Sequence, residues 1–367
     1  MVGAPRREWR RPGLGRPSGL FFRVVAWPVH LPSRIEFTVG TGDELARIMH
    51  DLIMPSLTIR HVTTYRYRQP VAFGEHRMML RPRDSHDQRV IEESLEISPE
   101  PRSLHFVQDA FGNHVGIARF SGRAKELCFE STVCLEHSPL DPADLDLEDA
   151  ARTFPVDYGA DEMPDLAYCI ECHQPGPMNE VGRWAHQFLP RSGAIGTLEL
   201  LTRLSKGINH GFLYRRREAK GIQQPVETLR LGHGSCRDFA MLMIEAARSL
   251  GFAARFASGY LAVPLDDPKE LTSGSARGST HAWAQIYLPG TGWIDFDPTI
   301  GSVGKIGLVT VAVVRDPRHA IPLHGTFIGV PSDHLGMEVQ VSVTSGTPGA
   351  IWATPHRSTW PQFHQSV

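Results

Sequence analysis

The chain has no long apolar run, almost no net charge and few cysteines, and each of these features excludes a class of protein. No stretch of about 18 consecutive apolar residues occurs, so the sequence predicts no transmembrane helix. A formal net charge of −2 gives no reason to expect nucleic acid or an anionic membrane as a partner. The five cysteines are an odd number for a chain of 367 residues, and they indicate reduced thiols in the cytoplasm instead of a disulfide framework.

The N-terminal segment lacks the pattern of a folded core and of a secretory signal. Residues 1–35 contain seven arginines against one acidic residue, with many glycines and prolines, and such a composition is typical of disorder. The apolar patch around Leu20–Leu31 is broken by Arg23 and Pro28, and no small-residue cleavage pattern follows it. A cytoplasmic location is therefore expected.

Strand and helix patterns divide the rest of the chain. The first part is rich in β-branched and aromatic residues separated by turn signals, which is typical of an all-β region. Met54 stands directly before it, so the true start is left open between Met1 and Met54. We expect a disordered or spurious extension at 1–53, a β-rich N-terminal domain at 56–136, a linker at 137–177, an α+β core at 178–325, a final strand region at 326–345 and a disordered tail at 346–367.

One cysteine stands at the start of the best amphipathic helix in the chain. Residues 234–238 read Gly-Ser-Cys-Arg-Asp, in which Ser235 and Asp238 match a capping box around Cys236. Apolar residues then recur at helical spacing until Gly251. A helix N-terminus stabilises negative charge and so favours the thiolate, which is the nucleophilic form. The alternative is a buried structural cysteine, because free cysteine is among the most buried residue types.

A histidine and two aspartates follow on a predicted β-hairpin. Residues 279–288 and 293–299 both alternate like strands and are joined by a turn rich in proline and glycine. Folding the hairpin brings His281 near Asp297. A three-residue loop or a single bulge puts these two side chains on one face, whereas a two- or four-residue loop separates them. Asp295 has the parity of Asp297 but lies deeper in the hairpin, so Asp297 is preferred.

The histidine and the aspartate also have structural interpretations. His281 can be a strand-edge residue held by a hydrogen bond, and Asp297 can begin a turn before Pro298. A cysteine, a histidine and an aspartate in this order are nevertheless the nucleophile, base and orienting acid of covalent catalysis. Beyond the hairpin, the strand patterns at 307–314 and 337–343 are expected to complete the same sheet.

These segments resemble the core of the bacterial transglutaminase-like superfamily. The resemblance covers roughly 180–325, and 56–135 resembles the β-rich domain that precedes this core in bacterial members. It implies an α+β, papain-like fold with the cysteine helix packed on an antiparallel sheet, and it implies Cys236, His281 and Asp297 as catalytic residues. The stretches that carry it are 234–238, 254–261, 281–283 and 292–299.

The resemblance implies acyl transfer through a thioester on Cys236. Hydrolysis of peptide or amide bonds, as by a cysteine peptidase or amidase, is the first expectation, and a protein-glutamine γ-glutamyltransferase is the alternative with the same acyl-enzyme. A non-catalytic interaction module is the alternative from another class. The expected partner is a peptide or protein substrate, and the oligomeric state is left open. Tyr214 and Trp283 are further candidates for oxyanion or substrate contacts, with Ser235 and Asp238 as structural supports.

A short cysteine motif elsewhere invites a different interpretation. Cys169, Cys172 and His173 form the C-x-x-C-H string used for c-type haem attachment. Haem attachment requires export, and a zinc site requires a second ligand pair of similar spacing, which the sequence lacks. A chance match is therefore favoured over redox or metal binding. No cofactor and no metal are expected.

Overall fold

The computed structural model describes most of the chain between Ser56 and Ser345. Several predictions concern residues outside the described part of the chain. These are the extension at 1–53, the start at Met1 or Met54, His173 and the tail at 346–367. No helix in the described part of the chain has the length and apolarity needed to cross a membrane. The described residues are 56–138, 145–172, 180–217, 221–262, 275–276, 278–304 and 307–345.

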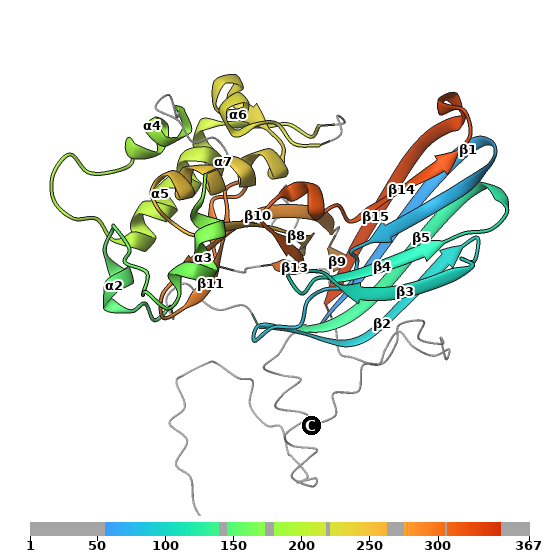
Figure 1. Cartoon of the computed structure of the whole chain (residues 1–367), viewed down its shortest axis with the longest axis horizontal. Helices are drawn as coiled ribbons and strands as arrows, with labels where there is room; N and C mark the ends of the chain where they lie inside the picture. Colours follow the sequence, from blue (N-terminus) through green and yellow to red (C-terminus); the bar gives the residue numbers. More distant parts are fainter. Residues whose placement is uncertain are drawn as a thin grey trace, which may run out of the picture. The chain divides into compact units, whose positions relative to one another are not determined.

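One long strand organises the first sheet. β1 (Ser56–Met78) is 23 residues long and pairs antiparallel with β5 (Arg123–His137) and with β15 (His334–Ser345). Figure 1 shows β1 and β15 side by side. The remaining strands are β2 (Gln88–Ser98), β3 (Ser103–Gln108), β4 (His114–Arg119), β9 (Ser275–Ala276) and β14 (Leu323–Ile328), and the 3₁₀ helices η3 (Pro317–His319) and η4 (Pro331–Asp333) precede β14 and β15.

β15 contradicts one expectation from the sequence. The pattern at 337–343 does form a strand, but this strand joins β1 in the first sheet and does not complete the second. Its register with β1 runs from Leu57↔Ser345 to Tyr67↔His334. The expectation is wrong because alternation of side chains specifies which face is buried but not which strand becomes the partner.

The second sheet contains the predicted hairpin. Its strands follow the order β12-β11-β10-β8-β13, so the pattern at 307–314 completes this sheet as expected. The strands are β8 (Ala254–Leu261), β10 (Ser279–Leu288), β11 (Gly292–Asp297), β12 (Ser302–Val303) and β13 (Leu308–Val314).

Helices cover one face of the second sheet (Figure 1). Phe239 and Leu242 of α7 share a buried core with Ala284 and Phe296 of the sheet, and small alanines on β10 allow a close approach. Each large buried side chain contributes roughly 1.5–3 kcal/mol. The predicted α+β class, with the cysteine helix on an antiparallel sheet, is confirmed. The elements are α4 (Glu180–His186), α5 (Thr197–Gly211), α6 (Pro225–Leu231), α7 (Cys236–Ser249) and the short strands β6 (Leu213–Tyr214) and β7 (His233–Gly234).

The described part of the expected linker at 137–177 packs against the second sheet. The hydroxyl of Tyr158 donates to the Tyr287 carbonyl at 3.1 Å and accepts from the Ala253 N–H at 2.9 Å. Leu166 is buried beside Tyr158. These apolar residues within an acidic stretch anchor the segment, so it is partly built into the core. Its helices are α2 (Asp149–Arg152) and α3 (Met163–Ile170).

The strand-rich region and the second sheet make buried contacts within one compact unit. Gln88 donates Nε2 to the Thr310 carbonyl at 2.7 Å and accepts from the Thr310 N–H at 2.9 Å. His61 Nδ1 lies 3.0 Å from the hydroxyl of Tyr260. The strand-rich region therefore supports the sheet that carries the hairpin.

Candidate active site

The hairpin has the register that puts the predicted base and acid on one face. Leu288 pairs with Gly292, so the loop is three residues long, and Gln285 pairs with Asp295. Gly290 and Gly292 have φ angles of 89° and 80°, which glycine adopts without steric cost. Alternation from these pairs places the following side chains on one face, opposite Ala284 and Phe296, which share the apolar core with α7: His281, Trp283, Gln285, Asp295 and Asp297.

His281 and Asp297 form a buried pair. Nε2 of His281 lies 2.6 Å from Oδ2 of Asp297, and the two residues are only 4% and 0% exposed. The second carboxylate oxygen accepts a hydrogen bond of 2.9 Å from the Thr299 N–H, which fixes the carboxylate. Because Nε2 is committed to Asp297, Nδ1 is the ring nitrogen that remains for the hydrogen bond between His281 and Cys236.

The surroundings of His281 favour its charged form. Burial disfavours the imidazolium, but the charge of Asp297 and the hydrogen bonds to Asp297 and Cys236 outweigh burial. They raise the pKa of His281 from its ordinary value of 6.5 to about 10. At neutral pH a positive charge therefore lies beside the Cys236 sulfur.

Asp238 holds the start of α7 to the preceding loop. Its buried Oδ2 accepts hydrogen bonds from the N–H and the hydroxyl of Ser235, both at 2.8 Å. Its Oδ1 accepts from the Gln223 N–H at 2.7 Å and from Arg217 Nη1 at 3.0 Å. The predicted capping box is present, and the fold adds two donors that no local pattern indicates. Together these bonds fix the backbone around Cys236.

Trp283 lies in the interior beside His281, and its expected role in oxyanion or substrate contacts stays a prediction. Its indole is fully buried, and its N–H donates to Asp295, which also accepts a 2.9 Å hydrogen bond from Gln285. The ring stacks against His281 with centroids 6.2 Å apart and planes inclined by 24°. Trp283 therefore supports His281 from behind, and Asp295 holds Trp283.

Tyr214 lies beside the loop that carries the cysteine. β6 pairs in parallel with β7, so Tyr214 is opposite Gly234, which is two positions before Cys236. The side chain is 42% exposed, and its ring meets Phe239 of α7 edge-on at 6.4 Å. This position keeps Tyr214 as a candidate oxyanion donor.

Arg237, the residue after the cysteine, is held by contacts with Pro317 and Phe256. Its Nη2 donates to the Pro317 carbonyl at 2.9 Å, and its guanidinium lies 5.3 Å from the ring centroid of Phe256. Burial lowers the pKa of Arg237. The residue after the cysteine thus ties α7 to the segment that follows β13.

Gly259 matters to the site in a way that sequence reasoning missed. It pairs with His281 on one side and with Thr310 on the other. A Cβ atom at this position would lie 1.9 Å from the carbonyl oxygen of Val309. Glycine therefore lets β13 approach the strand next to His281. A glycine inside a strand pattern was the available signal.

The cysteines of α3 and its end lie apart from these residues. Cys169 is buried and Cys172 is half-buried, and burial raises the pKa of both thiols. Among the described residues there is no group of three or more side chains that could hold a metal ion. The interpretation of the C-x-x-C-H string as a chance match stays a prediction.

Two family models match the chain. Residues 57–136 match the bacterial transglutaminase-like N-terminal region, and residues 191–298 match the transglutaminase-like superfamily. The second range includes Cys236, His281 and Asp297.

Relatives and solved structures extend these matches. The chain is 25% identical over 293 residues to Mycobacterium leprae "Uncharacterized protein ML0607", covering 78% of this chain and 98% of that protein. It is 34% identical over 76 residues to YebA of Bacillus subtilis, covering 18% of this chain and 10% of that protein. A solved structure from Cytophaga hutchinsonii, described as a "Putative Cysteine Protease", is similar with a TM-score of 0.58 and 20% identity. This match covers 84% of this chain and 94% of that one, and it shows a shared fold.

Proposed function

We propose that this chain, which belongs to the transglutaminase-like superfamily, is a thiol acyl-transfer enzyme that hydrolyses amide bonds in peptides or proteins. The observation that supports the proposal is the continuous hydrogen-bonded series from Cys236 through His281 to Asp297. A nucleophile, a base and an orienting acid in this sequence are the parts that acyl transfer requires.

In the first half of the reaction, the Cys236 thiolate attacks the amide carbonyl carbon, and the π electron pair moves onto the carbonyl oxygen. The oxyanion meets the N-terminus of α7, where the Cys236 N–H lacks a partner within the helix. Tyr214 is the second donor in this proposal. The imidazolium of His281 then gives its Nδ1 proton to the leaving nitrogen, the C–N bond breaks, and a thioester remains.

In the second half, water replaces the departed amine. His281 Nδ1 accepts a proton from water as the oxygen adds to the thioester carbon. The C–S bond then breaks, its electron pair returns to Cys236, and a carboxylic acid leaves. Asp297 accepts the hydrogen bond from the Nε2 N–H of His281 throughout and keeps the ring in this orientation. A primary amine in place of water yields a new amide, which is the transferase outcome.

Alkylation tests the activated thiolate without knowledge of the substrate. At neutral pH, iodoacetamide is expected to modify Cys236 faster than it modifies free cysteine, and the His281→Ala variant is expected to lose this advantage. Peptide mass spectrometry reads each cysteine separately, so Cys169 and Cys172 serve as internal controls. Equal reactivity of Cys236 in both proteins would contradict the proposal.

A defined peptide library separates the possible reactions. Cleaved peptides, or glutamine side chains converted to glutamate, are expected from the unmodified protein and not from Cys236→Ala. Incubation of a glutamine peptide with a primary amine provides the comparison, because dominant amine incorporation would replace hydrolysis by γ-glutamyl transfer. No conversion of any peptide, combined with an unreactive Cys236, would favour a non-catalytic module.

A further inference from the structure

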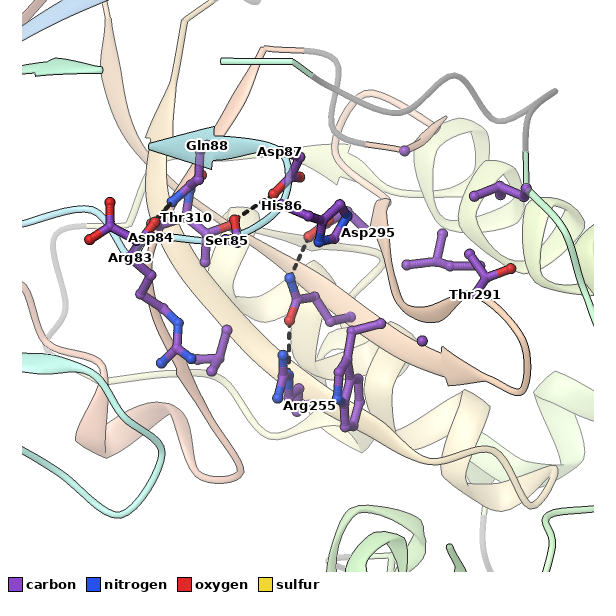
Figure 2. Close-up of a pocket in the computed structure, with 17 residues that line it drawn as sticks. Arg83, Asp84, Ser85, His86, Asp87, Gln88, Arg255, Thr291, Asp295 and Thr310 are labelled. Atoms are coloured by element: carbon purple, nitrogen blue, oxygen red, sulfur yellow. Dashed lines mark hydrogen bonds between the residues drawn. The ribbon is translucent and has the colours of Figure 1, made fainter. Parts of the chain in front are cut away.

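A cavity of about 360 Å³ lies on the same face of the second sheet as His281, toward the turn of the hairpin. Figure 2 shows its two walls: residues 83–88 from the strand-rich region, and the sheet with Arg255 and Asp295. Gln285 of the cavity stands four positions from His281 along β10, a separation of about 13 Å at the usual strand rise. The fully buried Trp283 lies between them in sequence, so the cavity is separate from the candidate active site.

Arg255 presents a cation to this cavity and has no carboxylate in hydrogen-bond contact, although the charge of Asp295 acts on it from nearby. Its Nε donates to the neutral Gln285 Oε1 at 2.8 Å, and its guanidinium carbon lies 3.9 Å from the ring centroid of Trp293. Across the described residues, Arg255 makes no ion pair. Burial, helped by the charge of Arg83, lowers the pKa of Arg255 to about 10. Keeping an unpaired guanidinium half-buried costs desolvation free energy unless an anion binds beside it.

Arg83 adds positive charge to the same cavity. Its Nη1 donates to two neutral acceptors, the Phe111 carbonyl and Asn113 Oδ1, both at 2.7 Å. In the described part of the chain Arg83 also has no ion pair. Two arginines therefore face one cavity, and neither of their charges is neutralised by a contacting carboxylate.

Thr310 supplies an independent sign that the cavity takes a ligand. This residue is 3% exposed and lines the cavity, and its hydroxyl makes no hydrogen bond to any described residue. A buried polar atom without a partner is unusual in proteins. The wall around it is rigid, because Gln88 binds both the N–H and the carbonyl of Thr310, as Figure 2 shows for the pair.

We propose that this cavity binds a small ligand that carries a carboxylate, with the guanidinium of Arg255 as the main contact and the hydroxyl of Thr310 as a second contact. Binding here breaks no bond in the ligand. The inference therefore goes beyond the acyl-transfer proposal and does not depend on it.

The charges of the cavity favour a carboxylate over a phosphate. A guanidinium stacked on a ring offers a planar edge of parallel N–H groups, which matches a planar carboxylate. Asp84, Asp87 and Asp295 also line the cavity; Asp84 is exposed at its rim, and Asp295 is held by Trp283 and Gln285. These negative charges repel a dianion, but they tolerate a monoanion whose other end carries an N–H or an ammonium group.

Calorimetric titration of the full chain with three dipeptides tests the proposal. Dialanine and N-acetyl-dialanine carry the carboxylate, and dialanine amide lacks it. We expect the first two to bind saturably and the amide to bind at least about tenfold more weakly. Inorganic phosphate at equal ionic strength is expected to bind more weakly than N-acetyl-dialanine. Absence of saturable binding, equal binding of the amide, or tighter binding of phosphate would each overturn the proposal.

Variants place the binding in this cavity. Arg255→Gln, and Arg255→Lys, which keeps the charge but loses the planar fork, are each expected to weaken binding at least about tenfold. Thr310→Val, which preserves the backbone bonds to Gln88, is expected to weaken it several-fold. The matched control is Arg315→Gln, since Arg315 also lies over an aromatic ring but pairs with Glu171 outside the cavity.

The variants also keep the inference separate from the proposed reaction. Circular dichroism shows whether Arg255→Gln folds. If it does not, the dipeptide affinities of Arg255→Lys and Thr310→Val test whether the ligand binds in this cavity. Wild-type affinity in the folded Arg255 and Thr310 variants, or equal weakening by Arg315→Gln, would contradict the assignment. Iodoacetamide labelling of Cys236 is measured on the same proteins and is expected to be unchanged. Loss of dipeptide binding with normal labelling therefore bears on the cavity alone.

Discussion

The two faces of the second sheet are built by the same strands but carry different kinds of side chain. The face toward α7 is apolar, and its hairpin residues belong to one buried cluster: Ala282, Ala284, Ile286, Ile294 and Phe296. The opposite face joins polar and aromatic groups through hydrogen bonds or stacking: His281, Trp283, Gln285, Asp295 and Asp297. Because successive side chains of a strand point to opposite faces, one face of the hairpin packs in the core and the other carries the candidate catalytic residues.

This difference predicts that substitutions on the polar face change reactivity and that those on the apolar face change stability. Both faces are buried, so burial alone does not distinguish them. The distinction lies in the partners, because one face gains free energy from removing apolar surface from water and the other from oriented charges. Three predictions test it, in order of decreasing effect, and a fourth compares His281 with a buried histidine of the first sheet.

Asp297→Asn is expected to reduce the rate of acyl transfer by roughly 10⁴-fold and to lower stability through the lost pairing with the His281 imidazolium, while the fold stays intact. The amide fills the same space, but it cannot hold the charged imidazole, and burial then lowers the pKa of His281. Steady-state kinetics on a cleaved peptide and thermal unfolding measure the two effects. A loss of less than tenfold would mean that Asp297 does not orient His281.

Phe296→Ala changes the apolar face at the position next to Asp297. The ring is fully buried against the core of α7, so its removal is expected to cost about 3–5 kcal/mol of unfolding free energy. Urea denaturation measures this cost. The labelling rate of Cys236 in the folded variant should stay close to that of the unmodified protein, and Ile286→Val, expected to cost about 0.5–1.5 kcal/mol, is the conservative control.

Trp283→Phe tests which aspartate serves the histidine. Phenylalanine keeps a ring against His281 but removes the N–H that binds Asp295, so a cost of about 1–3 kcal/mol in stability is expected. Turnover is expected to fall far less than in Asp297→Asn, because the bond from His281 to Asp297 remains. A fall as large as that of Asp297→Asn would show that the Asp295 network controls His281.

Two buried histidines are expected to give the protein opposite responses to pH. His61 lies between Tyr260 and Thr63, and burial lowers its pKa to about 4, so its contribution to stability is lost as the pH falls from 6.5 through 4. The pKa of His281 is raised to about 10, so its contribution is complete below pH 6.5 and is lost as the pH rises through 10. The unfolding free energies of His61→Gln, His281→Gln and the unmodified protein are measured across this pH range. The difference between the unmodified protein and each variant gives the contribution of that histidine at each pH. Curves of the same slope would contradict the assignment of charge.

Local patterns in the sequence were sufficient for part of the candidate site. The capping box, the apolar spacing after Cys236 and the alternation around His281 each depend on neighbouring residues, so they predict α7, β10 and β11 from short windows. The parity argument for His281 and Asp297 needed one further fact, the loop length, which the pairing of Leu288 with Gly292 supplies.

Long-range contacts explain what the sequence could not predict. Arg217 and Gln223 reach Asp238 from a separate segment, and no periodicity marks them. The burial of Trp283 also depends on a distant feature, because residues of the strand-rich region close over the polar face of the sheet. The pairing of β15 was mispredicted for the same reason. The strands of the two sheets present the same backbone hydrogen-bonding groups at their edges, so local sequence does not show which sheet β15 joins.

The amino-acid sequence by itself determined a cysteine at a helix start, a hairpin with a histidine and an aspartate, and a strand-rich region before them. These features follow from capping, side-chain period and turn composition, which act between residues close in the chain. Only the tertiary structure decided that Cys236, His281 and Asp297 meet, that Trp283 lies behind the histidine, and that Arg255 faces a cavity. Those outcomes depend on register and on packing between segments distant in sequence, where the free energy of burial is gained only after the chain has folded.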